Sequence, residues 1–237
     1  MALPQLDTPT FELRVHSLNK DLKFRPFRVK EEKVLMLATN EENFGDMVRA
    51  CQQVVTNCSF GELDATKIPM YDLQNIFLRL REKSIGETQD FTLSCGGEGC
   101  DAKINYTLNL PDMQLDGLDD IPDNKITVDK EKGIGIALRY PTNETVALVE
   151  DKGGSDDTEL LLDCIDHIYD DEQVYAREDT SKEELLEFME NLPIETMGEI
   201  RKYYFAMPIL EHIIDYKCPK CDRDNKVSIN GYEHFFA

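Results

Sequence analysis

Four cysteines in two close pairs constrain this chain more than any other feature of its 237 residues. The first pair lies in Cys95-Gly-Gly-Glu-Gly-Cys100 and the second in Cys218-Pro-Lys-Cys221, and strand-like residues flank both pairs. Two thiolates at a tight turn between two strands form a metal-binding knuckle, in which backbone N–H groups point towards the sulfurs. Two knuckles together supply the closed four-sulfur shell that structural zinc prefers. The sequence therefore predicts one structural zinc site made by Cys95, Cys100, Cys218 and Cys221.

The spacing within each pair fits a knuckle. Two residues separate Cys218 from Cys221, which is the usual spacing, and four residues separate Cys95 from Cys100, which is the wide end of the range. Three of those four residues are glycines, and they allow the positive φ angles of a tight loop. Because metal-binding free energy is also folding free energy, one shared ion would tie the end of the chain back to residue 100. We therefore expect a split zinc-ribbon-like unit with a scaffold role.

Other chemistry for these cysteines stays open at this point. An iron ion fits the same four thiolates, and the four thiols could also hold no metal. A redox Cys-x-x-Cys motif follows a strand and opens a helix, whereas strand-like residues follow Cys221. His212 and His234 lie near the second knuckle and could replace a cysteine ligand, although structural or surface roles are the simpler expectation.

The remaining cysteines and the chain's hydropathy indicate a cytoplasmic protein. Seven cysteines, an odd number, fit a reducing compartment better than a disulfide framework. Cys51 and Cys58 lie on or beside an apolar helical stripe, so we expect buried thiols there. Residues 1–9 lack the basic-then-apolar pattern of a secretion signal, and no apolar run approaches the roughly 20 residues of a membrane span. No membrane span is therefore expected.

The net charge of −21 is concentrated in the middle of the chain. Residues 111–200 contain 26 Asp and Glu against 7 Lys and Arg, a net charge of −19. So acidic a chain repels the phosphates of nucleic acid, and we expect no nucleic-acid partner. A solvated surface is the simplest interpretation of the acidic stretch, and a face for a basic partner protein is the alternative.

Apolar periodicity predicts an α+β fold of helical regions plus β-hairpins. Strand-like patterns cover residues 11–15, 22–27, 88–110, 126–128, 134–140 and 213–229. Helical spacing covers residues 30–38, 44–55, 73–80, 158–168, 182–191 and 195–207. Ser181 and Glu184 form a capping box that opens one of these helices, and residues 169–180 are expected to form an irregular exposed loop.

These patterns divide the chain into four expected parts. They are an N-terminal arm and helical region (1–87), a split zinc-ribbon-like unit (88–110 with 211–237), an acidic β-containing segment (111–150), and an acidic helical region (151–210). Residues 151–157 are charged and glycine-containing, and they are expected to form a linker.

Signs of catalysis are missing from the sequence. It contains no GxxxxGK[ST], GxGxxG, HExxH or GxSxG pattern, and its four histidines are widely spaced. A closed four-sulfur metal shell also leaves no open position for a substrate. We therefore expect a protein that is not an enzyme.

Several segments resemble one family. They run in order along the chain: Phe24-Arg-Pro-Phe27-Arg-Val-Lys-Glu-Glu32 onward to Ala38, Tyr71-Asp72 onward to Gly86, the first cysteine knuckle, and Tyr216-Lys-Cys-Pro-Lys-Cys221 onward to Phe235-Phe236. Together they resemble the baseplate hub assembly proteins of T-even-type contractile-tailed bacteriophages. The acidic middle of the chain carries none of the resemblance.

The resemblance implies a non-enzymatic protein that helps to build the central hub of the tail baseplate. Its implied partners are other hub proteins and the tape-measure protein, and its implied locations are the host cytoplasm during assembly and the virion tail baseplate. A zinc-ribbon adaptor that binds transcription machinery or nucleic acid is the alternative. Zinc ribbons often serve in such roles, but the basic group near the second knuckle is too small to make a nucleic-acid surface on so acidic a chain: Lys217, Lys220, Arg223 and Lys226.

Four residues near the chain ends are predicted partner anchors: Arg25, Phe27, Phe235 and Phe236. Arginine and aromatic side chains dominate the hot spots of protein interfaces. Packing into the protein's own core is the alternative for all four.

Overall fold

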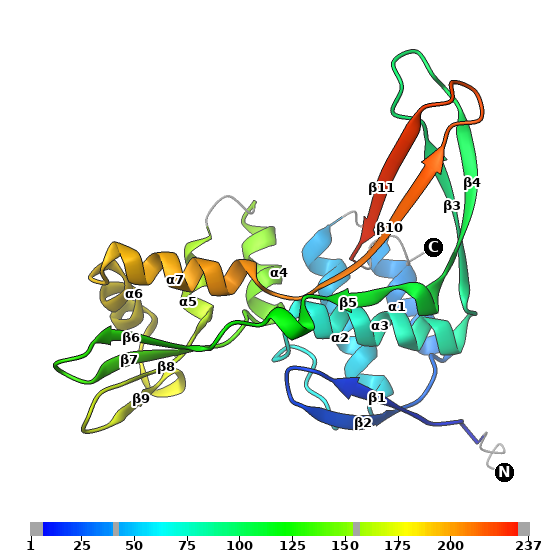
Figure 1. The fold of residues 1–237 in the computed structure, drawn as a ribbon. Coiled ribbons are helices and arrows are strands. Elements are labelled where there is room, and N and C mark those ends of the chain that lie inside the picture. Colours follow the sequence, from blue (N-terminus) through cyan, green and yellow to red (C-terminus); the bar gives the residue numbers. More distant parts are fainter. Residues whose placement is uncertain (1–6, 40–42, 154–156, 232–237) are drawn as a thin grey trace, which may run out of the picture.

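Two lobes, each with its own buried apolar cluster, make up the protein (Figure 1). The computed structural model describes residues 7–39, 43–153 and 157–231. Helices and small antiparallel sheets occur in both lobes, which confirms the predicted α+β class. None of the helices in the described ranges is long and apolar enough to cross a bilayer.

The first lobe is a helical body that a β-hairpin covers. The hairpin pairs β1 (Phe11–Val15) with β2 (Lys20–Phe24), and the body contains α1 (Val29–Thr39), α2 (Phe44–Cys58) and α3 (Met70–Ser84). The predicted helical stripes are buried because residues three or four apart share one helix face. The fully buried members are Val48, Cys51, Val55, Leu73, Ile76, Phe77 and Leu80.

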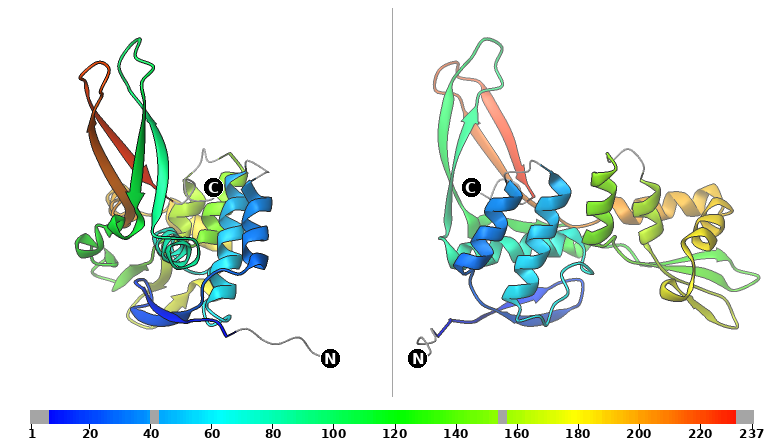
Figure 2. Two further views of the ribbon diagram at one scale, coloured as in Figure 1. Left: turned by 90° about the vertical axis from the view of Figure 1, so that its right-hand side faces the viewer. Right: turned by 180° about the vertical axis from the view of Figure 1, so that it is seen from behind.

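Two long β-hairpins rise from the first lobe, and we call them the first and second ribbons. The first ribbon pairs β3 (Thr88–Ser94) with β4 (Lys103–Asn109), and the second pairs β10 (Ile209–Lys217) with β11 (Asp224–Asn230). The ribbons lie side by side in both views of Figure 2. Their tips carry the two cysteine pairs, so the hairpins expected from the sequence are confirmed.

The second lobe is a four-stranded antiparallel sheet packed with helices. Its strands are β6 (Lys125–Asp129), β7 (Ile134–Leu138), β8 (Ile165–Tyr169) and β9 (Val174–Ala176), in that order across the sheet. Its helices are α5 (Thr158–Asp163), α6 (Lys182–Glu190) and α7 (Ile194–Phe205). The sheet joins strands from both sides of residue 150, so the acidic stretch forms one packed unit with its own core.

A short strand pair joins the two lobes. β5 (Gln114–Asp116) lies antiparallel to the start of β10, with Leu115 opposite Leu210. Residues 117–208 therefore leave and re-enter the first lobe at one place. Within this insertion, α4 (Asn143–Asp151) packs back on α2 of the first lobe (Figure 2). Single 3₁₀ turns occupy Leu110–Asp112, Leu118–Asp120 and Arg177–Asp179.

Three local predictions were wrong. The helix expected over 158–168 ends at Asp163, and the Ile165–Tyr169 segment is strand β8, because a short apolar run fits either structure and pairing with β7 decides. The loop expected over 169–180 contains strand β9 and a 3₁₀ turn. Helix α4 was not expected; it begins where the Thr142 side chain accepts the Thr145 N–H. The capping box of Ser181 and Glu184 is confirmed.

Candidate metal centre

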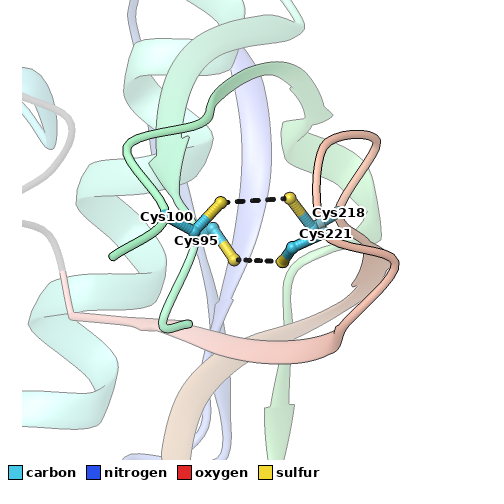
Figure 3. A group of neighbouring side chains, drawn as sticks. All are labelled: Cys95, Cys100, Cys218 and Cys221. Atoms are coloured by element: carbon cyan, nitrogen blue, oxygen red, sulfur yellow. Dashed lines mark hydrogen bonds between the residues drawn. The ribbon is translucent and has the colours of Figure 1, made fainter. Parts of the chain in front are cut away.

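The four cysteine sulfurs meet between the tips of the two ribbons (Figure 3). All four Sγ atoms lie within 4.8 Å of one another. The shortest contacts join one ribbon to the other, with 3.6 Å between the sulfurs of Cys95 and Cys221 and 3.8 Å between those of Cys100 and Cys218. The predicted convergence of two distant knuckles is therefore confirmed.

The sulfur spacing matches a metal shell and not a pair of disulfides. Four sulfurs about 2.3 Å from a tetrahedral zinc ion lie about 3.8 Å from one another. A disulfide brings its two sulfurs to about 2.05 Å. A tetrahedral metal with thiolate ligands therefore fits this donor set without movement of the backbone.

Backbone amides in each knuckle point at a sulfur, as a metal knuckle requires. The Gly97 N–H donates to the sulfur of Cys95 and the Lys220 N–H to that of Cys218, each at 3.4 Å. Gly97 lies so close to the shell that an added Cβ would be 3.4 Å from the Cys95 sulfur and 3.5 Å from the Cys221 sulfur. The glycines of the first knuckle thus allow a close approach of the backbone to the sulfurs.

Hydrogen bonds at the knuckles give two of the cysteine thiols different pKa values in the metal-free protein. Hydrogen bonds from the backbone amides of Cys221 and Lys220 lower the pKa of Cys218 to about 7. For Cys221, the Arg223 amide lowers the pKa, but hydrogen bonding with the neighbouring sulfurs outweighs it and raises the pKa to about 12. A divalent cation removes this inequality because it favours the thiolate form of every ligand.

The centre lies at the protein surface and has no open coordination position. Cys95 and Cys218 are buried, Cys100 is half-buried and Cys221 is exposed. Four thiolates complete the preferred shell of zinc, so a bound ion would hold the ribbons together without a site for substrate. A metal bound in this arrangement would therefore have a structural role, because it would have no open coordination position for a substrate.

Several polar contacts support the join between the ribbons. The Gly96 N–H donates to Oδ1 of Asn225 at 3.0 Å, and Nδ2 of Asn225 donates to the Arg223 carbonyl at 2.9 Å. The Tyr216 hydroxyl donates to the Ser94 carbonyl at 2.9 Å. The position of these partners was not predicted, because each one faces the opposite ribbon and no local pattern marks it.

Two of the four basic residues at the second knuckle are paired with acids. Lys220 forms an ion pair with Asp101 across the ribbons, and Nζ of Lys217 lies 2.9 Å from a carboxylate oxygen of Asp222. His212 lies away from the sulfurs, and its Nε2 is 3.3 Å from the Tyr106 hydroxyl. The two ion pairs weaken the attraction of this basic group for the phosphates of a nucleic acid.

The other cysteines are buried thiols. Cys51, Cys58 and Cys164 have no exposed surface. Burial raises the pKa of Cys51 far above its usual value, and it raises the pKa of Cys58 and of Cys164 to about 12. The burial expected for Cys51 and Cys58 is confirmed.

Of the four predicted partner anchors, two fall within the described residues, and both contact the first lobe. Arg25 is buried, and its guanidinium forms an ion pair with Glu31 at 2.9 Å. The ring of Phe27 is half-buried, with its centroid 5.7 Å from that of Phe77. Phe235 and Phe236 lie outside the described residues, as does His234. A role of these anchors in partner binding stays a prediction.

The fold and the site together define a class: a two-lobed α+β protein with two β-ribbons joined at a four-cysteine candidate metal centre. The family model described as T4 bacteriophage base plate protein matches residues 8–237, and the chain belongs to this family. Membership makes it a structural protein of a bacteriophage baseplate. No curated protein and no solved structure gives a significant match to the chain.

Proposed function

We propose that this protein is a non-enzymatic scaffold or assembly factor of the baseplate hub, in which zinc bound by Cys95, Cys100, Cys218 and Cys221 staples the two ribbons. The observation that carries the proposal is the match of nearly the whole chain to a baseplate family, with the four sulfurs at the ribbon tips. Other hub proteins and the tape-measure protein are the proposed partners, met first in the host cytoplasm.

The position of the centre explains what a staple would add. At their bases the ribbons pack into the core of the first lobe, where Leu108 and Leu210 are fully buried. The apolar packing extends up the ribbons to Leu93 and Tyr216, and beyond them the tips contribute turns, polar contacts and the sulfurs. A zinc ion there supplies a strong, closed-shell cross-link, and it fixes the ribbons as one rigid arm.

A rigid arm suits a protein that positions other proteins. Ordering a flexible segment at the moment of binding costs conformational entropy, and a pre-ordered arm has already met that cost. The second lobe gains a fixed place relative to the arm through β5, β10 and α4. We propose that hub components are aligned against this frame.

Elemental analysis of the full-length protein, purified under reducing conditions, tests the staple. We expect about one zinc per chain in the wild type, well below one in Cys218→Ser, and about one in the matched control Cys51→Ser, whose thiol lies in the helical core. A folded wild type without zinc or with iron would contradict the proposed metal.

The hub role needs a separate test in infected cells. In cells infected with a phage that lacks this protein, we expect no complete baseplate hubs by electron microscopy, and wild-type protein supplied from a plasmid should restore them. Supplied Cys218→Ser should restore them poorly. Normal hubs without the protein would exclude the assembly role but leave the zinc staple intact.

A further inference from the structure

The sheet of the second lobe lies at the end of the molecule away from the ribbons (Figure 1), and it helps to line an apolar groove with an acidic rim. Its volume is about 420 Å³, and β7, β8, β9 and α6 contribute to its walls. Ile134, Ile168, Tyr169 and Phe188 provide buried or half-buried apolar surface in it. Tyr175, which also lines it, is 40% exposed on the edge strand β9.

Three carboxylates line the same groove: Asp170, Asp179 and Glu184. Two of them are held in place by the fold. Asp170 accepts the N–H groups of Glu172 and Gln173, and Glu184 accepts both the N–H and the hydroxyl of Ser181. These hydrogen bonds keep the pKa of both carboxyls below their usual values, so both are ionised at neutral pH.

Nothing basic offsets this charge within the groove. Of the described residues, no lysine or arginine lines it. Three cations lie two residues from a lining residue in the sequence. Arg177 donates to the Leu162 carbonyl and pairs with Asp163, and Lys182 pairs with Glu159. The third, Lys132, lies 4.0 Å from a carboxylate oxygen of Asp129. The groove therefore combines exposed apolar surface with uncompensated negative charge.

We propose that this groove docks a basic segment of a partner protein, with an apolar side chain or a lysine or arginine stem lying on its floor. Lysine and arginine stems cover apolar surface while their charged heads reach carboxylates, and their cations bind well to tyrosine faces. Tyr169 and Tyr175 both line the groove. Charge complementarity of this kind selects a basic partner and excludes nucleic acid, whose phosphates the rim repels.

The docking proposal does not rest on zinc or on the hub role. Its test uses the full-length protein and a fluorescein-labelled hexapeptide, Lys-Lys-Leu-Leu-Lys-Lys, followed by fluorescence anisotropy at low ionic strength. Two further peptides separate the contribution of charge from that of apolar contact. One has glutamate in place of lysine, and the other has serine in place of leucine. We expect the first of these to show no binding and the second to bind more weakly than the parent peptide.

Two protein variants place the binding on the groove. We expect Asp179→Lys to weaken binding of the parent peptide roughly fivefold to tenfold, because it replaces rim attraction with repulsion. The matched control Glu62→Lys makes the same change of net charge at an exposed position of the first lobe, and we expect it to change binding less than twofold. Tyr175→Ser should weaken the leucine peptide more than the serine peptide, because both lose a tyrosine face for lysine and only the first also loses apolar contact. NMR shifts on peptide addition should cluster at β8, β9 and α6.

Several results would overturn the proposal. They are equal losses in Asp179→Lys and Glu62→Lys, shifts centred away from the groove, and no binding of the leucine peptide by the folded wild type. Sedimentation that shows a dimer broken by Asp179→Lys would assign the groove to a second copy of the chain instead.

Discussion

The sulfurs of Cys100 and Cys218 lie 3.8 Å apart although 118 positions separate the two residues in the sequence. The insertion between them includes the whole second lobe, and it returns to the first lobe beside the strand from which it left. The β5–β10 pair already brings the two ends of the insertion together at the base of the ribbons. The four-sulfur centre joins the same two parts of the chain a second time, at the ribbon tips. A metal ion at this place would lock the far end of the arm and leave the joint between the lobes to other contacts.

Zinc removal is expected to loosen the ribbon tips and leave the helical body intact. After chelation, amide hydrogens at the tip ends of the strands, near Ser94, Lys103 and Lys217, should exchange roughly tenfold faster or more, because the tips then open locally. Amides of α2 and α3 should keep their protection, since the core of the first lobe does not depend on the sulfurs. Hydrogen–deuterium exchange with mass spectrometry measures both regions at once. Uniform loss of protection would contradict a local staple.

Asn225 is expected to tune metal affinity without being a ligand. Its Oδ1 accepts the Gly96 N–H across the ribbons, so it orients the first knuckle. Loss of such an outer partner typically lowers metal affinity about tenfold to a hundredfold, and we expect Asn225→Ala to fall in this range. Competition with a zinc chelator measures the change. Asn230→Ala, at the exposed far end of the same strand, is the control and should retain wild-type affinity.

The buried ion pair of Arg25 and Glu31 should make stability depend on pH in a defined direction. Burial raises the pKa of Glu31, but hydrogen bonds from Arg25 and from the Arg28 amide outweigh it, so the pKa lies below its usual value. A carboxyl with a lowered pKa stabilises the fold above its unfolded-state pKa of about 4.3, and this contribution is lost as the pH falls through the folded-state pKa.

Arg25→Met tests this pair, because it removes the buried cation and leaves the Glu31 carboxylate only the exposed Lys30, 3.4 Å away. We expect a loss of about 3–5 kcal/mol in the free energy of unfolding at pH 7. Without Arg25, burial raises the pKa of Glu31, so the deficit should shrink as the pH falls and the carboxyl takes up a proton. Urea unfolding at pH 7 and pH 5 measures both effects. The double variant with Glu31→Gln should recover much of the loss; an unchanged deficit at both pH values would refute the pairing argument.

Local features of this fold could be predicted from the sequence because their causes are local. The capping box of Ser181 and Glu184 and the stripes of α2 and α3 depend on residues within a few turns of one another. The meeting of the four cysteine sulfurs was also predictable despite its long range, because a tetrahedral zinc site needs four ligands and two cysteine pairs could supply them.

Features that depend on tertiary pairing could not be predicted in the same way. The Ile165–Tyr169 segment has apolar residues at helical spacing, and only the neighbouring strand β7 makes it a strand. The acidic groove combines residues from three strands, a turn and a helix, and its net charge depends on Arg177 and Lys182 turning elsewhere. No pattern in the sequence shows which acids a cation will neutralise.

Asn143 is expected to control how firmly the two lobes are joined. It is fully buried at the start of α4, where its side-chain amide donates to the Ile68 carbonyl at 2.7 Å and lies 3.3 Å from the carbonyls of Ala65 and Pro69. Asn143→Ala removes the side-chain donor from these carbonyls, of which those of Ile68 and Pro69 keep the backbone N–H groups of Asn143 and Leu73. We therefore expect a loss of about 1 kcal/mol in the free energy of unfolding.

Asn143→Asp should be worse than Asn143→Ala at neutral pH, because a carboxylate would face three carbonyl oxygens in a buried site. Glu144→Ala, at the next and exposed position of α4, is the matched control and should change stability by no more than about 0.5 kcal/mol. Urea unfolding measures the stabilities, and small-angle X-ray scattering follows the separation of the lobes. If Asn143→Ala and Glu144→Ala behave alike, the joint depends on the β5–β10 pair and on α4 packing, and the amide has no special role.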